Sequence, residues 1–357
     1  MSGGAAATTE RVIGKPNLEV FAATIEELAQ TDPRLVVVTS DSRGSGKLSS
    51  FGSRRPDRVV EVGIAEQHLV GMAAGLAAGG KNVFAVSPAS FVATRSLEQI
   101  KHDICYSDHP VTVVGISAGV SYGALGTTHH SLHDFAALRA IHNIVVVAPG
   151  DNWEAREAVR HAAESAMPVY LRFGKRPLPD LGGRPEQPEA VTAAAPDTPN
   201  APGDRPDRAE ATTAAAATAA DFAAGRGRLL RDGGDGLIVT TGETGWRGLA
   251  ACERLAEMGY SVGLLHMHTV KPLDGELLVR AAAGVRAVLA TEEHSVHGGL
   301  GEACAARLLQ AGVRCSFEQA AIPDEYTVTG SQEEILSHYG ISPDGLAARM
   351  AKLLEES

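Results

Sequence analysis

The chain has 357 residues, more than one domain usually contains, which favours two domains. It carries 32 Lys and Arg against 43 Asp and Glu, and this net charge of −11 argues against a nucleic acid or an anionic membrane surface as a partner. Four scattered cysteines without CxxC spacing exclude a zinc ribbon and a disulfide framework. No apolar run is long enough to span a membrane and the N-terminal segment lacks an apolar core, so we expect a cytoplasmic protein.

Residues 1–15 are polar and small, and we expect a disordered tail there. Helical and strand patterns then alternate up to residue 180. We expect strands at 35–39, 59–62, 82–87, 111–116, 144–148 and 169–172, and helices at 18–30, 67–78, 95–107, 134–140 and 153–164. Because continuous apolar strands alternate with helices, residues 16–180 predict a parallel sheet that is covered on both faces.

Residues 181–221 are rich in Ala and Pro and contain few large apolar side chains, so they predict a flexible linker. A second α/β pattern follows at 222–357. Its strands are expected at 236–240, 261–266 and 288–291, and its helices at 246–257, 275–282, from about 301, 332–339 and 343–355. The predicted fold class is therefore α/β, with two parallel-sheet domains.

The most informative segment is VEVGIAEQHLVGMAAGLAA at residues 60–78, which predicts a strand, a tight turn at Gly63 and a helix. Glu66 then lies in the first turn of the helix and at the carboxyl edge of the sheet. Taken alone, a carboxylate at a helix start is explained by the helix dipole. However, the carboxyl edge is also where open α/β sheets bind their ligands.

The GIAEQH run resembles the pyrimidine-binding domain of the transketolase family, which includes deoxyxylulose-phosphate synthases and the β subunits of 2-oxoacid dehydrogenases. Five further segments follow in the order of that family: SFVATRSLEQIKHD (90–103), GVSYGALGTTHHSLHDFAALR (119–139), PVYLRFGKR (168–176), HMHTVKPLD (266–274) and TEEHSVHGGLG (291–301). The resemblance implies a thiamine diphosphate pyrimidine-binding domain at 16–180 and a transketolase C-terminal domain at 222–357.

The resemblance also implies roles at the cofactor. Glu66 takes the position of the family's catalytic glutamate, which hydrogen-bonds N1′ of the aminopyrimidine ring. Phe91 falls where the family stacks an aromatic ring on that heterocycle, although an ordinary core position is the alternative. Arg95 is assigned to cofactor binding, with a structural ion pair to Glu98 or Asp103 as its alternative.

For the substrate, the resemblance implies that His129 is catalytic and contacts the sugar hydroxyls. Transketolases commonly carry an aspartate four residues earlier, where this chain has Leu125, so we expect an altered or less polar substrate. Lys175 falls where many relatives have an arginine for the substrate phosphate; a lysine supplies the charge without the bidentate fork. Ser45 aligns with a second phosphate contact, and a plain loop is its alternative.

Full-length relatives hold the diphosphate through Mg²⁺ with a Gly-Asp-Gly sequence and a later asparagine. The one Gly-Asp-Gly here, at 234–236, opens a strand and no asparagine follows Asn200, so we expect a turn. We therefore predict that this chain holds no metal itself. A partner subunit carrying Gly-Asp-Gly and asparagine is expected to supply Mg²⁺ and the diphosphate site, plausibly in an α2β2 assembly.

We thus expect the C-terminal subunit of a split transketolase that transfers a two-carbon ketol unit from a ketose phosphate to an aldose. The alternative is a subunit that acts on a 2-oxoacid, as a decarboxylating β subunit or an acyloin-forming enzyme. A remote alternative is a serine hydrolase, because Gly115–Gly119 matches G-x-S-x-G with Ser117 as the nucleophile. Three histidines, His266, His268 and His294, are expected to be buried with hydrogen-bond partners and to bind no metal.

Overall fold

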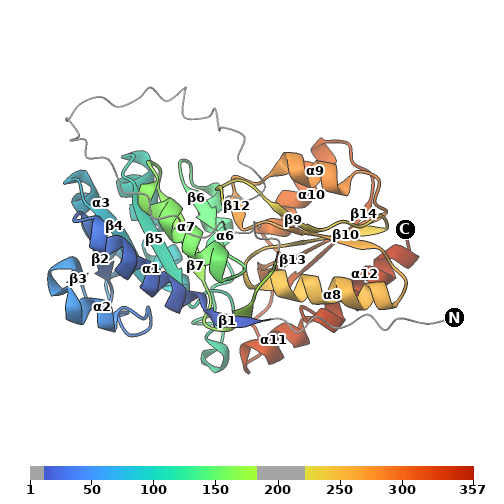
Figure 1. Ribbon diagram of the computed structural model, residues 1–357, viewed down its shortest axis with the longest axis horizontal. Helices are drawn as coiled ribbons and strands as arrows, with labels where there is room; N and C mark the ends of the chain where they lie inside the picture. Colours follow the sequence, from blue (N-terminus) through green and yellow to red (C-terminus); the bar gives the residue numbers. More distant parts are fainter. Residues whose placement is uncertain (1–11, 183–221) are drawn as a thin grey trace, which may run out of the picture.

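The computed structural model describes residues 12–182 and 222–357, which form two α/β halves lying side by side (Figure 1). The first half is drawn in blue to green and the second in orange to red. Most of the predicted linker at 181–221 lies outside the described residues. The predicted domain limits therefore stay predictions.

The first half is built on a seven-stranded sheet with the strand order β12-β6-β7-β5-β4-β2-β3. Its strands run nearly without interruption through Val, Ile, Leu and Phe, and the central ones are buried on both faces, as expected of a covered parallel sheet. The bounds are β2 (Leu35–Thr39), β3 (Val59–Glu61), β4 (Asn82–Pro88), β5 (Val111–Ile116), β6 (Val145–Val147), β7 (Val169–Phe173) and β12 (Thr269–Lys271).

Helices cover both faces of this sheet. One face carries α1 (Asn17–Thr31), α2 (Ser49–Arg54) and α7 (Asn152–Glu164). The other face carries α3 (Glu66–Ala78), α4 (Ala89–Arg95), α5 (Leu97–Gln99), a π-helical segment at Ile100–Tyr106 and α6 (Asp134–Ala140).

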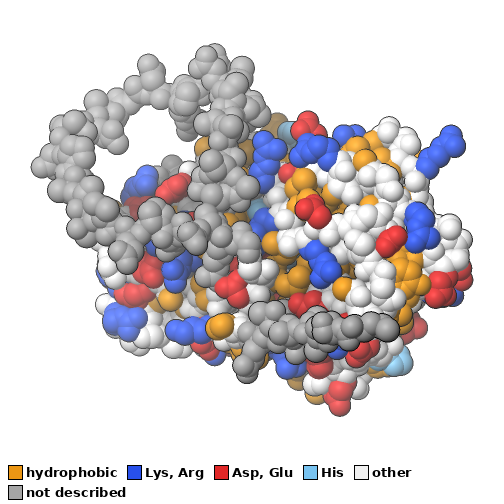
Figure 2. Space-filling view, turned by 45° about the vertical axis from the view of Figure 1, so that its right-hand side comes forward, with side chains coloured by type: hydrophobic (Ala, Val, Ile, Leu, Met, Phe, Trp, Pro, Cys, Tyr) orange, Lys and Arg blue, Asp and Glu red, His pale blue; other side chains and the backbone are white. Residues whose placement is uncertain are grey.

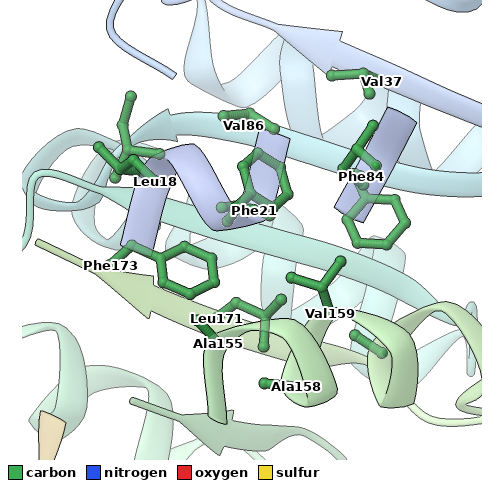
Figure 3. Packing of buried hydrophobic residues seen from close by; sticks show 14 of the residues in the cluster. Leu18, Phe21, Val37, Phe84, Val86, Ala155, Ala158, Val159, Leu171 and Phe173 are labelled. Atoms are coloured by element: carbon green, nitrogen blue, oxygen red, sulfur yellow. The ribbon is translucent and has the colours of Figure 1, made fainter. Parts of the chain in front are cut away.

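Three phenylalanines anchor the first face (Figure 3). The ring of Phe21 on α1 lies 6.3 Å from that of Phe84 on β4 and 5.7 Å from that of Phe173 on β7, measured between ring centroids. Each is almost fully buried, and burial of one such side chain contributes about 1.5–3 kcal/mol. This packing fixes β7, and hence the residues that follow it, against the rest of the first half.

The second half is built on a five-stranded sheet with the order β14-β13-β10-β11-β9. Its strands are β9 (Arg228–Arg231), β10 (Gly236–Thr240), β11 (Val262–His266), β13 (Ala287–Ser295) and β14 (Ser316–Ile322). In Figure 1, α9 (Gly275–Ala282) and α10 (Leu300–Gln310) lie above the sheet, and α8 (Gly245–Glu257) and α12 (Pro343–Glu355) lie below it. A short helix, α11 (Gln332–His338), follows β14 on the chain.

The two-domain α/β class predicted from the sequence is confirmed, but the sheets are not purely parallel. β9 pairs antiparallel with β11, and β12, which belongs to the second half, pairs antiparallel with β6 of the first. Sequence patterns missed these short edge strands because tertiary pairing forms them, not a local apolar period.

The end of the predicted tail also differs from expectation. Residues 13–15 belong to a strand, β1 (Ile13–Pro16), which pairs antiparallel with β8 (Pro177–Pro179). The side chain of Asn152 fixes this strand, since it accepts from the amide of Lys15 and donates to the carbonyl of the same residue. The predicted helix at 95–107 likewise begins earlier and is divided among α4, α5 and the π-helical segment.

Buried charges connect the two halves. Arg172 of β7 lies 2.8 Å from Asp134 and also donates to the backbone carbonyl of Glu293 in the second half. Glu154 of α7 forms a second connection, 3.1 Å from His266 of β11. On the face drawn in Figure 2, acidic and basic side chains are interspersed. Among the described helices, none is both long and apolar enough to cross a membrane.

Candidate active site

Side chains from segments that follow five parallel strands gather at the carboxyl edge of the first sheet. Ligands of open α/β sheets bind at this edge because the loops that leave it are free to carry polar groups. The residues are Lys47 after β2, Glu66 after β3, Phe91 and Arg95 after β4, Tyr122 and His129 after β5, and Lys175 after β7.

Glu66 is the buried acid of this group. It is the first residue of α3, its exposed fraction is 4%, and the helix has no side-chain cap. Gly63 adopts a φ of +72°, which places the turn before the helix in a conformation that glycine favours. The free amides and the dipole at the helix start favour a carboxylate at this position.

Phe91 and Arg95 both come from α4 and face the same acid. The guanidinium of Arg95 lies 3.0 Å from Oε1 of Glu66 and 4.1 Å from the centroid of the Phe91 ring. Arg95 therefore pairs with Glu66 instead of Glu98 or Asp103, the alternative partners in its own helical region. The arrangement places a carboxyl group and an aromatic ring together, with a cation bridging them.

His129 lies between two aromatic rings. Its ring centroid is 5.4 Å from that of Phe91 and 5.4 Å from that of Tyr122, both in edge-on geometry. The hydroxyl of Thr128 is 2.9 Å from Nδ1 of His129. The histidine is thus held beside the Phe91 ring, as the sequence comparison with the family led us to expect.

A pair of lysines closes the other end of the group. The Nζ atom of Lys175 lies 3.8 Å from the centroid of the Tyr122 ring. Partial burial lowers the pKa of Lys175, and the charge of nearby Lys47 lowers it further. Two neighbouring cations suit a doubly charged anion.

Lys47 and Tyr122 were not among the predicted site residues. Both follow the carboxyl end of a parallel strand, and that position is the signal that could have identified them. Ser45, which we did predict, is exposed in the turn before Lys47, where the amide of Gly46 bonds to the carbonyl of Ser42. The turn brings the lysine toward Lys175, and no contact joins Ser45 to the other site residues described here.

Leu125 and Ser117 belong to the same loop region as His129. Leu125 ends a 3-10 turn at Gly123–Leu125 and has an exposed fraction of 56%. Ser117 is fully buried with a φ of +56°, but only the 3-10 turn lies between it and α6. A nucleophile elbow needs a helix directly after its serine, so this geometry does not support the hydrolase alternative.

The residues around Glu66 fit an aminopyrimidine ring. A flat heterocycle can stack on an aromatic face such as that of Phe91, and a buried carboxyl can accept a hydrogen bond from a ring nitrogen. The hydroxyl of Ser90, next to Phe91, is buried and lacks a hydrogen-bond partner among the described atoms. Glu66, Phe91 and Arg95 are therefore the residues that would hold the ring of thiamine diphosphate.

The histidines of the second half have partners of their own. His266 contacts Thr240 and Glu154, His268 contacts Thr269, and His294 lies 2.9 Å from the carbonyl of Ser295. Over residues 12–182 and 222–357, no three or more His, Cys, Asp and Glu side chains are grouped so that they could hold a metal ion.

The Gly-Asp-Gly triplet forms a bend before β10, as expected. Its aspartate, Asp235, accepts from the amide of Ser261 at 2.7 Å and pairs with Arg286 at 3.4 Å. These contacts give the aspartate a structural role.

Comparison with known proteins places these features in a family. Residues 16–180 match the transketolase pyrimidine-binding domain, and residues 225–346 match the transketolase C-terminal domain. The chain is 37% identical to a subunit of the apulose-4-phosphate transketolase from Phocaeicola vulgatus, over 91% of this chain and 93% of that one. It is 34% identical to the 1-deoxy-D-xylulose-5-phosphate synthase of Symbiobacterium thermophilum, over 94% of this chain but 46% of that enzyme.

A solved structure described as a split gene transketolase, inactive beta4 tetramer, superposes with a TM-score of 0.74. It is 32% identical in sequence, and the match covers 96% of this chain and 99% of that one. These matches define a transketolase-type α/β enzyme subunit. The chain belongs to the transketolase family and comprises its pyrimidine-binding and C-terminal domains.

Proposed function

We propose that the chain is the C-terminal subunit of a cytoplasmic split transketolase that transfers a two-carbon ketol unit from a ketose phosphate to an aldose. One observation carries the proposal: contacts run without a break from Glu66 through Arg95, Phe91, His129 and Tyr122 to Lys175. This series provides an acid, an aromatic platform, a histidine and a cation at one sheet edge.

Thiamine diphosphate, when bound, supplies a nucleophilic carbon that accepts the two-carbon unit. Glu66 would hold a proton at its carboxyl oxygen against the aminopyrimidine ring, and Phe91 would orient that ring. Arg95 is 48% exposed and can leave Glu66 or share it, so the ion pair keeps the acid in place before the ring binds. His129 would donate to or accept from the donor hydroxyls, which suits an imidazole near neutral pH.

The lysine pair would bind the charged end of the donor. Lys175 and Lys47 are close enough to affect one another, and a phosphate between them would relieve their repulsion. One relative is named for a 4-phosphate substrate, which agrees with an anionic end. Ser45, in the same turn as Lys47, would add a hydroxyl to that site.

The Mg²⁺ and diphosphate site would come from a partner subunit that carries Gly-Asp-Gly and asparagine, in an α2β2 assembly. Chain length supports this: the chain spans nearly all of the relative from Phocaeicola vulgatus but only about half of the single-chain synthase. The solved relative is described as an inactive tetramer of β chains. We expect this chain alone to be inactive in the same way.

The test is reconstitution. The chain would be co-expressed with candidate partners that carry the Gly-Asp-Gly and asparagine motif, supplied with thiamine diphosphate and Mg²⁺, and assayed for two-carbon transfer from ketose phosphates to aldoses. Turnover that requires both subunits and is lost in Glu66→Gln is the expected result. Robust turnover by the chain alone, or by Glu66→Gln, would refute the assignment.

A second candidate function rests on Leu125. Its exposed apolar side chain lies four residues before His129, where a donor rich in hydroxyls would meet a polar group in many relatives. This favours a less hydroxylated donor such as a 2-oxoacid, as in acyloin-forming enzymes. Pyruvate in the same reconstituted assay separates the two: turnover with pyruvate but not with ketose phosphates would favour the second function.

A further inference from the structure

The loop that carries His129 is fastened to the second half of the molecule. Its two ends meet at Gly119 and Ser131, where the amide of Ser131 donates to the carbonyl of Gly119 at 2.8 Å. Between them, Val120 is fully buried in an apolar cluster that belongs otherwise to the second half, apart from Leu132 at its margin. The amide of Val120 also donates to Oε1 of Glu293 at 2.7 Å.

The far side of the loop is held by one buried side chain, Thr327. The segment of residues 323–329 between β14 and α11 is exposed except for this threonine, whose exposed fraction is 7%. The neighbouring backbone is fixed, because the amide of Val328 donates to the Tyr339 hydroxyl and that hydroxyl donates to Glu325. Thr327 is therefore presented to the loop by a rigid support.

Two contacts reach the loop from the Thr327 hydroxyl. It lies 3.0 Å from the hydroxyl of Thr127 and 2.7 Å from Nδ1 of His130. The opposite nitrogen of His130, Nε2, is 3.0 Å from the carbonyl of Gly123. The loop is thus connected from its 3-10 turn, through the His130 ring, to the second half.

The direction of these hydrogen bonds follows from the groups involved. Burial, together with the charge of His129, lowers the pKa of His130, so the ring is neutral near pH 7. A carbonyl only accepts, so Nε2 carries the proton and Nδ1 accepts from Thr327. The Thr327 oxygen in turn accepts from Thr127, and each member of the chain is satisfied.

We propose that Thr327 is a positioning residue for catalysis, which fixes His129 against the Phe91 ring by holding the next residue, His130, and the preceding Thr127. The second half thereby takes part in the active site without touching the substrate. This inference rests on the role proposed above for His129. It also makes the geometry of the site depend on the docking of the two halves.

The first test needs no partner subunit. Hydrogen exchange of the purified full chain would be followed by mass spectrometry in the wild type, Thr327→Val and Thr327→Ser. Valine keeps the shape but leaves His130 without its donor, so we expect exchange in peptides covering residues 119–131 to become roughly tenfold faster. Serine retains the hydroxyl and should exchange like the wild type.

Thr24→Val is the matched control. Thr24 is a buried threonine of α1, and its hydroxyl donates to the carbonyl of Val20 within the same helix. Its loss should leave exchange at 119–131 unchanged. Wild-type exchange in Thr327→Val, or an equal increase in Thr24→Val, would overturn the proposal.

The second test uses the reconstituted enzyme and asks whether Thr327 acts through His129. Because small misplacements of a catalytic group are expensive, kcat/KM of Thr327→Val should fall between about 10- and 100-fold, with recovery in Thr327→Ser. In a His129→Gln background, the same change should lower kcat/KM less than about twofold further. Independent, multiplicative losses would contradict positioning through His129.

The two tests separate the failures. If the wild-type complex transfers no two-carbon unit from any donor, the proposed function is refuted and hydrogen exchange alone decides whether Thr327 holds the loop. If the complex is active but Thr327→Val matches it in kcat/KM, the proposed function stands and this inference is wrong.

Discussion

The guanidinium of Arg95 lies 3.0 Å from Oε1 of Glu66, so a buried acid at a helix start is paired with a half-exposed cation. The exposure is uneven, 4% for the Glu66 side chain and 48% for that of Arg95. The acid is therefore reached only through the region that Arg95 and the Phe91 ring border. This relationship makes Glu66 the residue whose chemistry can be tested most directly.

We expect Glu66→Gln to abolish turnover while the fold persists. Glutamine keeps the shape and the hydrogen bond to Arg95 but cannot exchange a proton, so loss of activity would report the chemistry of the carboxyl group. Steady-state turnover of the reconstituted enzyme measures this, and circular dichroism of the variant checks the fold. Glu276→Gln, an exposed carboxyl on α9, is the control and should keep full activity. Turnover in Glu66→Gln comparable to that of the control would contradict the assignment.

Much of the fold could be predicted because local pattern and tertiary structure agree. The bounds of β2, β10, α9 and α12 match the predicted ranges, since each is a complete apolar strand or a capped amphipathic helix. The antiparallel edge strands β9 and β12 were missed because their few residues carry no period. Their positions depend on a partner strand far away in the sequence.

The site was predictable to a similar extent. Motif resemblance led to Glu66, Phe91, Arg95, His129 and Lys175, which the structure brings together. It did not lead to Thr327, because an exposed-looking threonine in a loop of the second half has no sequence signal for burial. Only the docking of the two halves gives it contacts to Thr127 and His130.

The lysine pair predicts how the enzyme senses the charged end of its donor. Replacing Lys175 with Met should raise KM for a phosphorylated donor about 10- to 100-fold, which is the usual worth of a hydrogen bond to a charged group. Lys47→Met should have a smaller effect, because Lys47 is exposed and shared with Glu19 at 3.3 Å. Both KM values are measured by donor titration.

The control for both variants is Lys81→Met, since Lys81 precedes β4 at the opposite edge of the sheet. KM for an unphosphorylated donor should be unaffected in all three variants. An equal rise of KM for both kinds of donor in Lys175→Met would mean that the lysine does not read the phosphate.

Leu125 predicts donor selectivity. We expect Leu125→Asp to raise kcat/KM for hydroxylated ketose phosphates by about tenfold or more relative to pyruvate, because a carboxylate adds an acceptor for donor hydroxyls near His129. Ala124→Asp tests whether any nearby negative charge has this effect, since Ala124 is also exposed in the same 3-10 turn. An unchanged donor ratio in Leu125→Asp would show that this position does not face the substrate.

The buried pair of Arg172 and Asp134 predicts a stability effect between the halves. Burial alone would raise the pKa of Asp134, but the charge of Arg172 outweighs it and the pKa is lowered. Arg172→Met leaves that carboxylate unpaired and should lower the free energy of unfolding by about 3–5 kcal/mol, measured by urea titration.

Adding Asp134→Asn to Arg172→Met should recover much of this loss, because the second change removes the buried charge. The exposed pair of Arg160 and Glu27 is the comparison, and Arg160→Met should change stability by less than about 1 kcal/mol. A double variant as unstable as the sum of its single changes would contradict a charge-based explanation.

A pair of buried acids predicts that stability falls as the solution becomes more alkaline. Burial raises the pKa of Glu243 to about 7, with a further contribution from the nearby charge of Glu293, whose own pKa is raised by burial. Both carboxyls accept from the amide of Gln332. The folded state thus keeps protons that the unfolded state has already released, so stability is lost as pH rises through the folded pKa.

The pH window from about 6.5 to 8 isolates this effect. Buried histidines such as His268, whose pKa burial lowers to about 4, are neutral there in the folded state. Asp134 and Glu154, whose pKa values are lowered, are ionised throughout the window. Glu292, with a pKa raised by burial to about 7, contributes a loss of the same sign and remains in every variant.

We therefore expect the melting temperature of the wild type to decline between pH 6.5 and 8, and Glu243→Gln to decline less steeply because one of the titrating groups is gone. Scanning calorimetry at closely spaced pH values measures both slopes. Glu333→Gln is the matched control: its carboxyl pairs with Arg247 and has a lowered pKa, so removing it should leave the slope in this window unchanged. Parallel slopes for the wild type and Glu243→Gln would mean that Glu243 is already ionised at neutral pH.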